Sequence, residues 1–214
     1  MPAPCDTLLI VFGARGHGRV VADAALAAGG WRGVVASDRD PALWGTQLLP
    51  GVPILAPDAL RGLSGNLALH VAIGDNTSRR AEAEALRGLA PLASVVHPRA
   101  ALAPSAEVGP GCLLAAQAVV GPLARLGAGV IVNHGAVVDH DCALDAWCHV
   151  APGAVLGGGV RVGAGALLGA GCVVLPERTV GAAATLGAGA LATRSVPDGQ
   201  RWAGVPARTL KSAS

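Results

Sequence analysis

The sequence predicts a two-part chain: an α/β domain over residues 1–94, followed by a parallel β-helix over residues 95–214. From residue 95 onward the chain repeats every six residues, whereas before that point strand-like and helix-like segments alternate around a glycine-rich turn. The chain is 52% hydrophobic but only 2% aromatic and contains 31 glycines, so its interior is expected to consist of small aliphatic side chains.

The first part alternates predicted strands and helices. The elements expected, in chain order, are a strand over residues 8–12, a glycine turn over 13–18, a helix over 20–28, strands over 33–36 and 67–73, and a helix capped by Asn76 or Thr77. This order of elements is typical of a short, Rossmann-like βαβ nucleotide-binding domain.

The glycine turn GARGHG is the candidate nucleotide site. Gly13, Gly16 and Gly18 miss the full G-x-G-x-x-G spacing of dinucleotide-binding proteins, so a bare turn without a ligand stays an alternative. The surrounding order strengthens the functional interpretation, because the turn carries the polar His17 and Asp38 ends the next strand. Helix N-termini at such turns bind phosphate, and acidic residues at such strand ends bind a ribose or a base.

The second part is a hexapeptide repeat. Sixteen consecutive hexads carry Val or Leu at one position, from residue 96 to residue 186, and the residue four places later is Ala, Val or Cys in all but Arg178. This pattern predicts a solenoid of short parallel strands stacked about 4.8 Å apart. Four cysteines at the small position are expected to be buried and unpaired: Cys112, Cys142, Cys148 and Cys172.

Charge and hydropathy exclude several classes of protein. The net charge of +2 comes from scattered arginines, so no basic stripe indicates nucleic acid. Glycines and prolines interrupt the uncharged stretch 108–124, which excludes a membrane-spanning helix there. The first apolar run has no basic region before it, so no signal peptide is expected, and the cytoplasm is the expected compartment.

The order of the two parts and five motifs resemble the hexapeptide-repeat acyltransferases, in particular the bacterial family that acetylates nucleotide-linked amino sugars and sialic acids. The motifs are GARGHG at 13–18, VAIGDN at 71–76, NHGAVVDHDC at 133–142, HVAPGAVLGGG at 149–159 and GVPAR at 204–208. The resemblance covers essentially the whole chain, and the N-acetyltransferases of bacillosamine and perosamine synthesis belong to this family. It implies a left-handed β-helix with three hexads per coil, and homotrimers with active sites between neighbouring prisms.

His140 is the candidate general base. A base needs an imidazole within reach of the attacking group and a partner that fixes its tautomer, and two acids bracket His140. The resemblance assigns the base to His140 and the partner to Asp141, where the family often has Glu. Because Asp is one methylene shorter, Asp139 stays a second candidate. A solvated turn histidine is the alternative, and it is the interpretation adopted for His134.

The resemblance also implies residues that bind the two substrates. It places His149 near the acetyl thioester, where a donor would polarise the carbonyl, and small residues along the pantetheine arm of acetyl-CoA. Asn133 corresponds to a substrate-side polar residue, although a turn cap is the alternative. The pantetheine residues are Gly158, Ala170 and Ala188, and the residues expected to bind the nucleotide sugar are Gly13, Gly16, His17, Gly18, Asp38 and Gly74.

These residues predict direct acetyl transfer from acetyl-CoA to the amine, expected at C4, of a nucleotide-linked amino sugar, without a metal or a covalent enzyme intermediate. An amine is favoured over a hydroxyl because its conjugate acid titrates closer to the reference pKa of histidine, about 6.5. Three alternatives stay open: O-acetylation of sialic acid or another sugar, a metalloenzyme of the γ-carbonic-anhydrase kind, and a non-enzymatic scaffold that binds sugar nucleotides.

Overall fold

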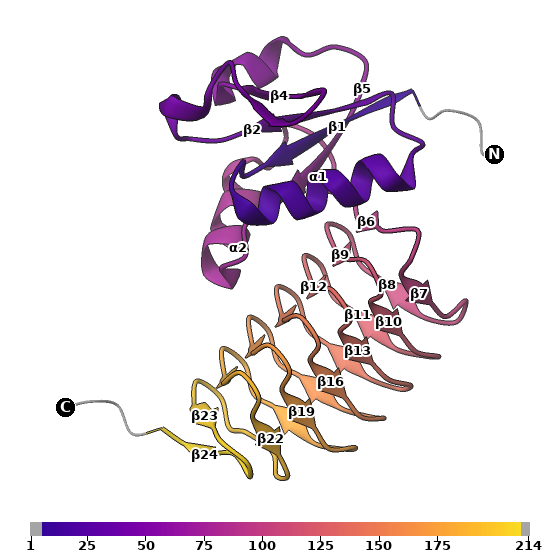
Figure 1. Ribbon diagram of the computed structural model, residues 1–214, viewed down its shortest axis with the longest axis vertical. Coiled ribbons are helices and arrows are strands. Elements are labelled where there is room, and N and C mark those ends of the chain that lie inside the picture. The colour runs from indigo at the N-terminus through magenta and orange to yellow at the C-terminus, as the bar shows by residue number, and fades with distance from the viewer. Residues whose placement is uncertain (1–5, 211–214) are drawn as a thin grey trace. The chain divides into compact units, whose positions relative to one another are not determined.

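The computed structural model describes residues 6–210, which form two compact units divided between Pro98 and Arg99 (Figure 1). The division falls four residues after the predicted one, because strand β6 (Val95–Val96), the first of the hexad strands, packs against helix α1 of the first unit. No helix within residues 6–210 is long and apolar enough to cross a membrane.

A five-stranded sheet organises the first unit. Its order is β3 (Gln47–Leu49), β4 (Val52–Leu55), β2 (Gly33–Ser37), β1 (Thr7–Phe12) and β5 (Asn66–Val71). The central strand β1 pairs in parallel with β2 and β5, and its residues Leu9, Ile10 and Val11 are fully buried. The predicted βαβ pattern is therefore present, with helix α1 (Gly16–Ala28) between β1 and β2.

Three local features of the first unit differ from the sequence prediction. Helix α1 begins at Gly16, not at residue 20, so the second half of the expected glycine turn is helical. Helix α2 (Asn76–Ala85) is capped by Asp75, not by Asn76 or Thr77, because the carboxylate of Asp75 accepts a hydrogen bond of 2.8 Å from the Ser78 amide. The sequence prediction missed the antiparallel pair β3–β4 and two 3₁₀ helices, η1 (Pro41–Leu43) and η2 (Pro57–Gly62).

The second unit is the predicted left-handed parallel β-helix, in which each hexad contributes a two-residue strand to one of three faces (Figure 1). The first face has β7 (Ala101–Leu102), β10 (Val119–Val120), β13 (Val137–Val138), β16 (Val155–Leu156), β19 (Val173–Val174) and β22 (Leu191–Ala192). The second face has β8 (Glu107–Val108), β11 (Arg125–Leu126), β14 (Ala143–Leu144), β17 (Arg161–Val162) and β20 (Thr179–Val180). The third face has β9 (Leu113–Leu114), β12 (Ile131–Val132), β15 (His149–Val150), β18 (Leu167–Leu168), β21 (Thr185–Leu186), β23 (Arg201–Ala203) and β24 (Arg208–Thr209).

The register of the β-helix confirms the hexapeptide interpretation. Residues eighteen apart are paired, so that Val137 lies between Val119 and Val155. The repeating Val or Leu points into the prism, and Leu114 and Leu156 are fully buried. Four free cysteines of the second unit fill the small interior position as predicted: Cys112, Cys142, Cys148 and Cys172.

Candidate functional site

His140 and Asp141 form a pair at one corner of the β-helix, in the turn between β13 and β14. Nδ1 of His140 lies 2.7 Å from Oδ2 of Asp141, and both side chains are more than half exposed. Asp141 adopts a left-handed backbone conformation with a φ of 58°, at the turn position that Gly159 occupies one coil later with a φ of 68°. When Nδ1 donates its proton to Asp141, Nε2 is the ring atom that can accept a proton.

Asp139 and Asp141, the two acids beside His140, have different structural roles. Asp139 accepts a hydrogen bond of 2.7 Å from the backbone amide of His140, so it fixes the turn, whereas Asp141 contacts the ring. The hydrogen bond with Asp141, and next the negative charge of Asp139, raise the pKa of His140 above its ordinary value. The geometry therefore favours Asp141 over Asp139 as the orienting partner.

Gly158 lies directly beside the imidazole of His140. A Cβ atom built on Gly158 would overlap Nε2 and Cε1 of that ring, and the amide of Gly159 donates to the carbonyl of His140 at 2.9 Å. The His140 ring therefore packs against the backbone of the next coil of the β-helix at Gly158. The contact of Gly158 with the pantetheine arm stays a prediction, and the structure shows that the absence of a side chain at Gly158 leaves space for the His140 ring.

Within residues 6–210, no exposed thiol lies beside this pair. Cys142, next to Asp141, points into the prism, where its Sγ donates to the carbonyl of Gly157 at 3.3 Å. Burial raises the pKa of the Cys142 thiol, and it raises the pKa of Cys172 to about 12. Thiolates at these positions are therefore disfavoured, which agrees with acyl transfer that uses no cysteine nucleophile.

Asn133 and His149 form a second polar group on the prism. Nδ2 of the buried Asn133 lies 3.2 Å from Nε2 of His149, which projects from strand β15. Oδ1 of Asn133 accepts a hydrogen bond of 2.9 Å from the amide of His134, so the turn-cap interpretation of Asn133 is also correct. If the Asn133 amide donates to Nε2, a neutral His149 carries its proton on Nδ1.

The residues expected along the pantetheine arm lie at two corners of the prism. Gly158 belongs to the corner between the first and second faces, with His140. Ala170 and Ala188 lie in stacked turns between the third and first faces, where the amide of Gly189 donates to the carbonyl of Ala170 at 2.8 Å. Both corners border the first face, but one chain does not bring these three residues together.

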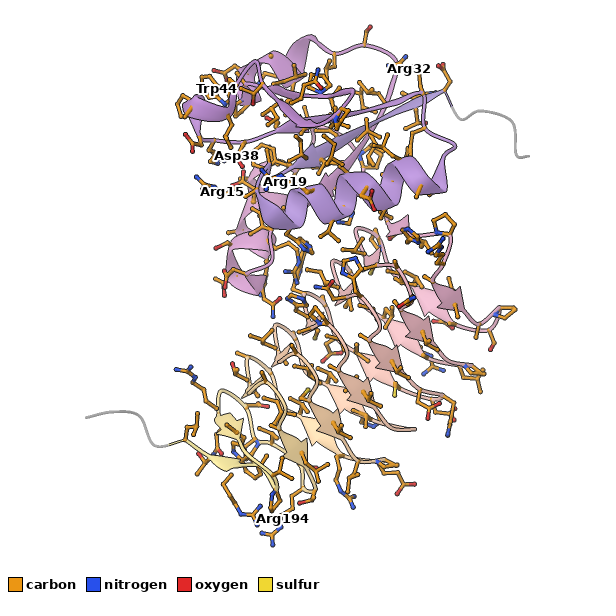
Figure 2. The ribbon with its side chains drawn as sticks, in the orientation of Figure 1. Arg15, Arg19, Arg32, Asp38, Trp44 and Arg194 are labelled. Carbon is orange, nitrogen blue, oxygen red and sulfur yellow. The ribbon has the colours of Figure 1, made fainter. Side chains whose placement is uncertain are left out.

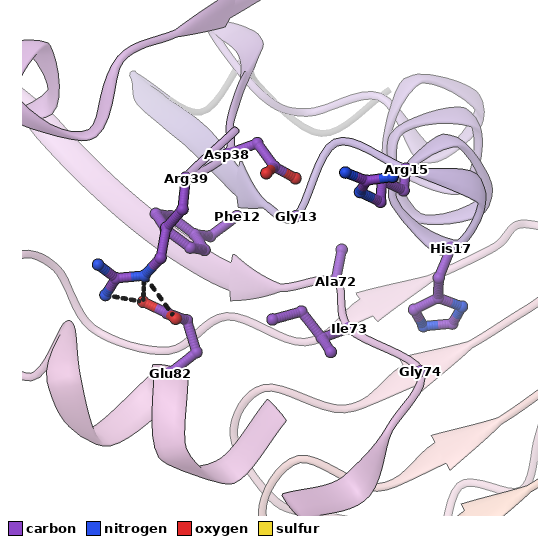
Figure 3. A pocket seen from close by; sticks show the side chains of 10 residues that line it. All are labelled: Phe12, Gly13, Arg15, His17, Asp38, Arg39, Ala72, Ile73, Gly74 and Glu82. Carbon is purple, nitrogen blue, oxygen red and sulfur yellow. Dashed lines mark hydrogen bonds and ion pairs between the residues drawn. The ribbon is translucent and has the colours of Figure 1, made fainter. Parts of the chain in front are cut away.

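A cavity of about 340 Å³ lies at the carboxyl ends of the strands of the first unit (Figure 3). Four of the residues expected to bind the nucleotide line it: Gly13, His17, Asp38 and Gly74. Gly16 and Gly18, which flank His17 in the first turn of α1, do not line it. Gly18 instead packs against the carbonyl of Gly13, where a Cβ atom would overlap the oxygen.

Asp38 joins the glycine turn to the end of β2. Its Oδ2 accepts a hydrogen bond of 2.7 Å from the amide of Ala14, and its Oδ1 accepts one of 2.9 Å from the amide of Asp40. Gly13 adopts a φ of 108°, and a Cβ atom there would lie 2.7 Å from the Ala72 carbonyl oxygen, so only glycine fits. The carboxylate of Asp38 thus shapes the cavity in addition to lining it.

Six further residues line this cavity that the sequence prediction missed: Phe12, Arg15, Arg39, Ala72, Ile73 and Glu82. The position of Arg39 directly after Asp38 was a signal that could have been used. Glu82 lies on α2, far along the chain, and no sequence pattern connects it with the glycine turn.

Comparison with known proteins places the chain in a family. The model of the PglD N-terminal domain matches residues 8–86. The acetyltransferase domain of PglB from Neisseria gonorrhoeae, solved with acetyl coenzyme A, is 40% identical, with 96% of this chain and 100% of that chain covered and a TM-score of 0.90. The chain belongs to the nucleotide-sugar N-acetyltransferase family.

Two further solved structures are similar to the chain. PerB from Caulobacter crescentus, solved with CoA and GDP-perosamine, is 37% identical over 95% of this chain and 97% of that chain, with a TM-score of 0.86. WeeI from Acinetobacter baumannii is 27% identical over 95% and 100% of the two chains, with a TM-score of 0.75. Among curated proteins, no sequence matches the chain. The family and the fold predicted from the hexapeptide repeat and the five motifs are confirmed.

The arrangement of potential metal ligands bears on the metalloenzyme alternative. Over residues 6–210, no three side chains of His, Cys, Asp or Glu gather closely enough to hold a metal ion. His134 and His140 lie in turns at different corners, one after β12 and the other after β13.

Proposed function

We propose that the protein transfers the acetyl group of acetyl-CoA to the amine at C4 of a nucleotide-linked amino sugar, with His140 as general base. The observation that carries this proposal is the 2.7 Å contact between Nδ1 of His140 and Asp141, which leaves Nε2 to accept a proton. The acetyl-CoA dependence is supported by the relatives, since the PglB domain was solved with acetyl coenzyme A and PerB with CoA.

The reaction is a direct acyl transfer. The amine nitrogen attacks the thioester carbonyl carbon while Nε2 of His140 removes its proton. The tetrahedral intermediate then breaks its C–S bond, and the proton returns from His140 to the departing sulfur, so CoA leaves as a thiol. We assign polarisation of the thioester carbonyl to the Nδ1–H of His149, whose Nε2 faces Asn133.

The two substrates are assigned to different residues. The nucleotide is held by the cavity of the first unit, through Gly13, His17, Asp38 and Gly74. The pantetheine arm of acetyl-CoA runs along Gly158, Ala170 and Ala188, where the absence of large side chains gives access to backbone amides. PerB was solved with GDP-perosamine, which supports an amino sugar on a nucleotide as the acceptor.

We also propose that the protein works as a homotrimer. The outward residues of the first face are all apolar, which leaves an apolar column along the prism, whereas the second face carries Glu107, Arg125 and Arg161 at the equivalent positions. The column consists of Ala101, Val119, Val137, Val155, Val173 and Leu191. Contact through this face would bring the His140 corner of one subunit towards the Ala170 corner of a neighbour. The expected compartment is the cytoplasm, where acetyl-CoA is available.

A mass-spectrometric screen tests the proposed function. Purified protein is incubated with acetyl-CoA and with nucleotide-linked 4-amino sugars, nucleotide-linked 3-amino sugars and sialic acid as separate acceptors. Formation of an acetamide on the 4-amino sugar, faster than on any other acceptor, is the expected result. A faster reaction of a hydroxyl acceptor would show an O-acetyltransferase and leave the fold and His140 assignments standing.

A further inference from the structure

An ion pair between Arg39 and Glu82 closes one side of the cavity in the first unit (Figure 3). Nε of Arg39 donates to both carboxylate oxygens of Glu82, at 3.2 and 3.0 Å, and Nη2 donates to Oε1 at 2.6 Å. The Glu82 side chain is only 14% exposed, whereas Arg39 is 63% exposed. The hydrogen bonds with Glu82 and the charge of Glu82 raise the pKa of Arg39, so the guanidinium stays charged at neutral pH.

The surroundings of this pair suit a flat aromatic ligand. The guanidinium of Arg39 lies 5.9 Å from the centroid of the Phe12 ring, so a planar cation stands over an aromatic side chain at the cavity wall. Bases bound in proteins stack on such planes while side chains read their hydrogen-bonding edges. The volume of about 340 Å³ falls within the range of small-molecule sites.

The position of the pair within the cavity indicates which end of a nucleotide it meets. Arg39 and Glu82 lie on one side of the cavity, and His17, from the first turn of α1, lies on the opposite side (Figure 3). A helix N-terminus is the favourable place for a phosphate. A nucleotide whose diphosphate approaches α1 would therefore direct its base towards Arg39 and Glu82.

We infer that the Arg39–Glu82 pair selects guanine, so that the acceptor sugar is carried by guanosine diphosphate. This inference rests on the proposed function. Guanine presents one acceptor, O6, beside two adjacent donors, N1–H and N2–H. Oε2 of Glu82 accepts only one hydrogen bond from Arg39, so its second lone pair can be shared by the two adjacent donors, while the exposed guanidinium donates to O6.

The other bases match the hydrogen-bonding groups of Glu82 and Arg39 less well than guanine does. Uracil and thymine have a single N–H between two carbonyl groups, so one carbonyl oxygen would face the carboxylate. Adenine and cytosine each direct a ring nitrogen lone pair towards it. Each mismatch loses a charge-assisted hydrogen bond and sets like partial charges against one another.

Calorimetry on the wild-type protein tests the inference with nucleoside diphosphates as probes. GDP is expected to bind at least about tenfold more tightly than UDP, dTDP, ADP or CDP, because a bidentate contact discriminates between bases by about ten- to a hundredfold. Inosine diphosphate lacks the 2-amino group, so it should bind about tenfold more weakly than GDP. Equal binding of the inosine and guanosine nucleotides would overturn the assignment without any variant.

A variant series then locates the effect. Glu82→Gln removes the negative charge and places an amide where guanine needs an acceptor, so GDP affinity should fall about ten- to a hundredfold, while UDP affinity changes little. Glu84→Gln is the matched control, because Glu84 lies on the same helix, pairs with Arg87 at 2.7 Å and does not line the cavity. Loss of GDP affinity in the control, or an unchanged preference in Glu82→Gln, would contradict the inference.

The result separates the two proposals. Tighter binding of UDP than of GDP, together with acetylation of a UDP-linked amino sugar, would overturn guanine selection and leave the proposed function intact. Binding of GDP without acetylation of any nucleotide-linked amino sugar would support guanine selection and contradict the proposed function.

Discussion

The imidazole of His140 lies so close to Gly158 that a Cβ atom at Gly158 would overlap its Nε2 and Cε1 atoms. The two residues are eighteen apart, one full coil, and stacked turns hold them in register through the hydrogen bond from the Gly159 amide to the His140 carbonyl. The position of the His140 ring thus depends on two contacts. Its Nδ1 pairs with Asp141, and its Nε2 and Cε1 atoms occupy the space that a side chain at residue 158 would fill.

Gly158→Ala is expected to reduce kcat by about the 10²–10⁴-fold that general-base catalysis contributes, because the added methyl group displaces the ring. The fold should tolerate the change, since the overlapping atoms belong to a side chain that is 58% exposed. Gly62→Ala is the control, because a Cβ atom there meets nothing within 4 Å. A Gly158→Ala variant with normal kcat would show that the ring does not act from this position.

Asp141→Asn is expected to shift the pH profile of kcat/KM to lower pH. The base must be neutral, so the rate rises as pH passes upwards through the pKa of His140, which Asp141 raises. Loss of that hydrogen bond brings the pKa back towards its ordinary value, and loss of orientation lowers the plateau. Asp139→Asn should shift the profile less, because Asp139 acts on the ring through its charge alone. The reverse order in measured profiles would make Asp139 the partner.

Asp38→Ala is expected to raise the KM for the sugar nucleotide about tenfold, while kcat and CoA binding stay close to normal. The physical reason is that Asp38 holds the amides of Ala14 and Asp40, and a charged hydrogen bond of this kind contributes about 1.5–3 kcal/mol. Asp58→Ala, in η2, serves as the control. Calorimetry that showed weaker CoA binding and normal nucleotide binding would contradict the assignment of the cavity.

Val155→Glu is expected to convert the trimer into monomers, because it places a charge in the middle of the apolar column of the first face. Ala143→Glu is the matched control on the second face, where the new acid would lie between Arg125 and Arg161. Light scattering should show loss of the trimer in the first variant and not in the second. Light scattering that showed a fully active wild-type monomer would contradict the trimer proposal.

Much of the fold followed from the sequence because the β-helix repeats one interaction many times. From Leu114 to Leu186, the Val or Leu of each hexad is buried, and so is the small residue four places later at every position except Arg178, so the pattern in the sequence is the pattern of the core. The α/β unit has no such repetition. The cap of α2 at Asp75 depends on a single hydrogen bond to the Ser78 amide. The early start of α1 depends on the backbone geometry around Gly16 and Gly18. Sequence periodicity reveals neither feature.

The candidate site divides in the same way. His140, Asp141 and Gly158 belong to a local motif and to an eighteen-residue register, so the contact between His140 and Gly158 could have been predicted from the repeat. Arg39 and Glu82 are separated by a strand, two short helices and a hairpin, and only the folded sheet brings them to one cavity. Long-range pairs of this kind leave no pattern in a single sequence.

The most direct test of the account is the rate of acetyl transfer by His140→Ala, measured beside the wild type with acetyl-CoA and a nucleotide-linked 4-amino sugar. The variant is expected to fold, to bind CoA normally and to lose about 10²–10⁴-fold in kcat, whereas the wild type forms the acetamide. An unchanged rate in His140→Ala would contradict the central claim that this histidine is the general base.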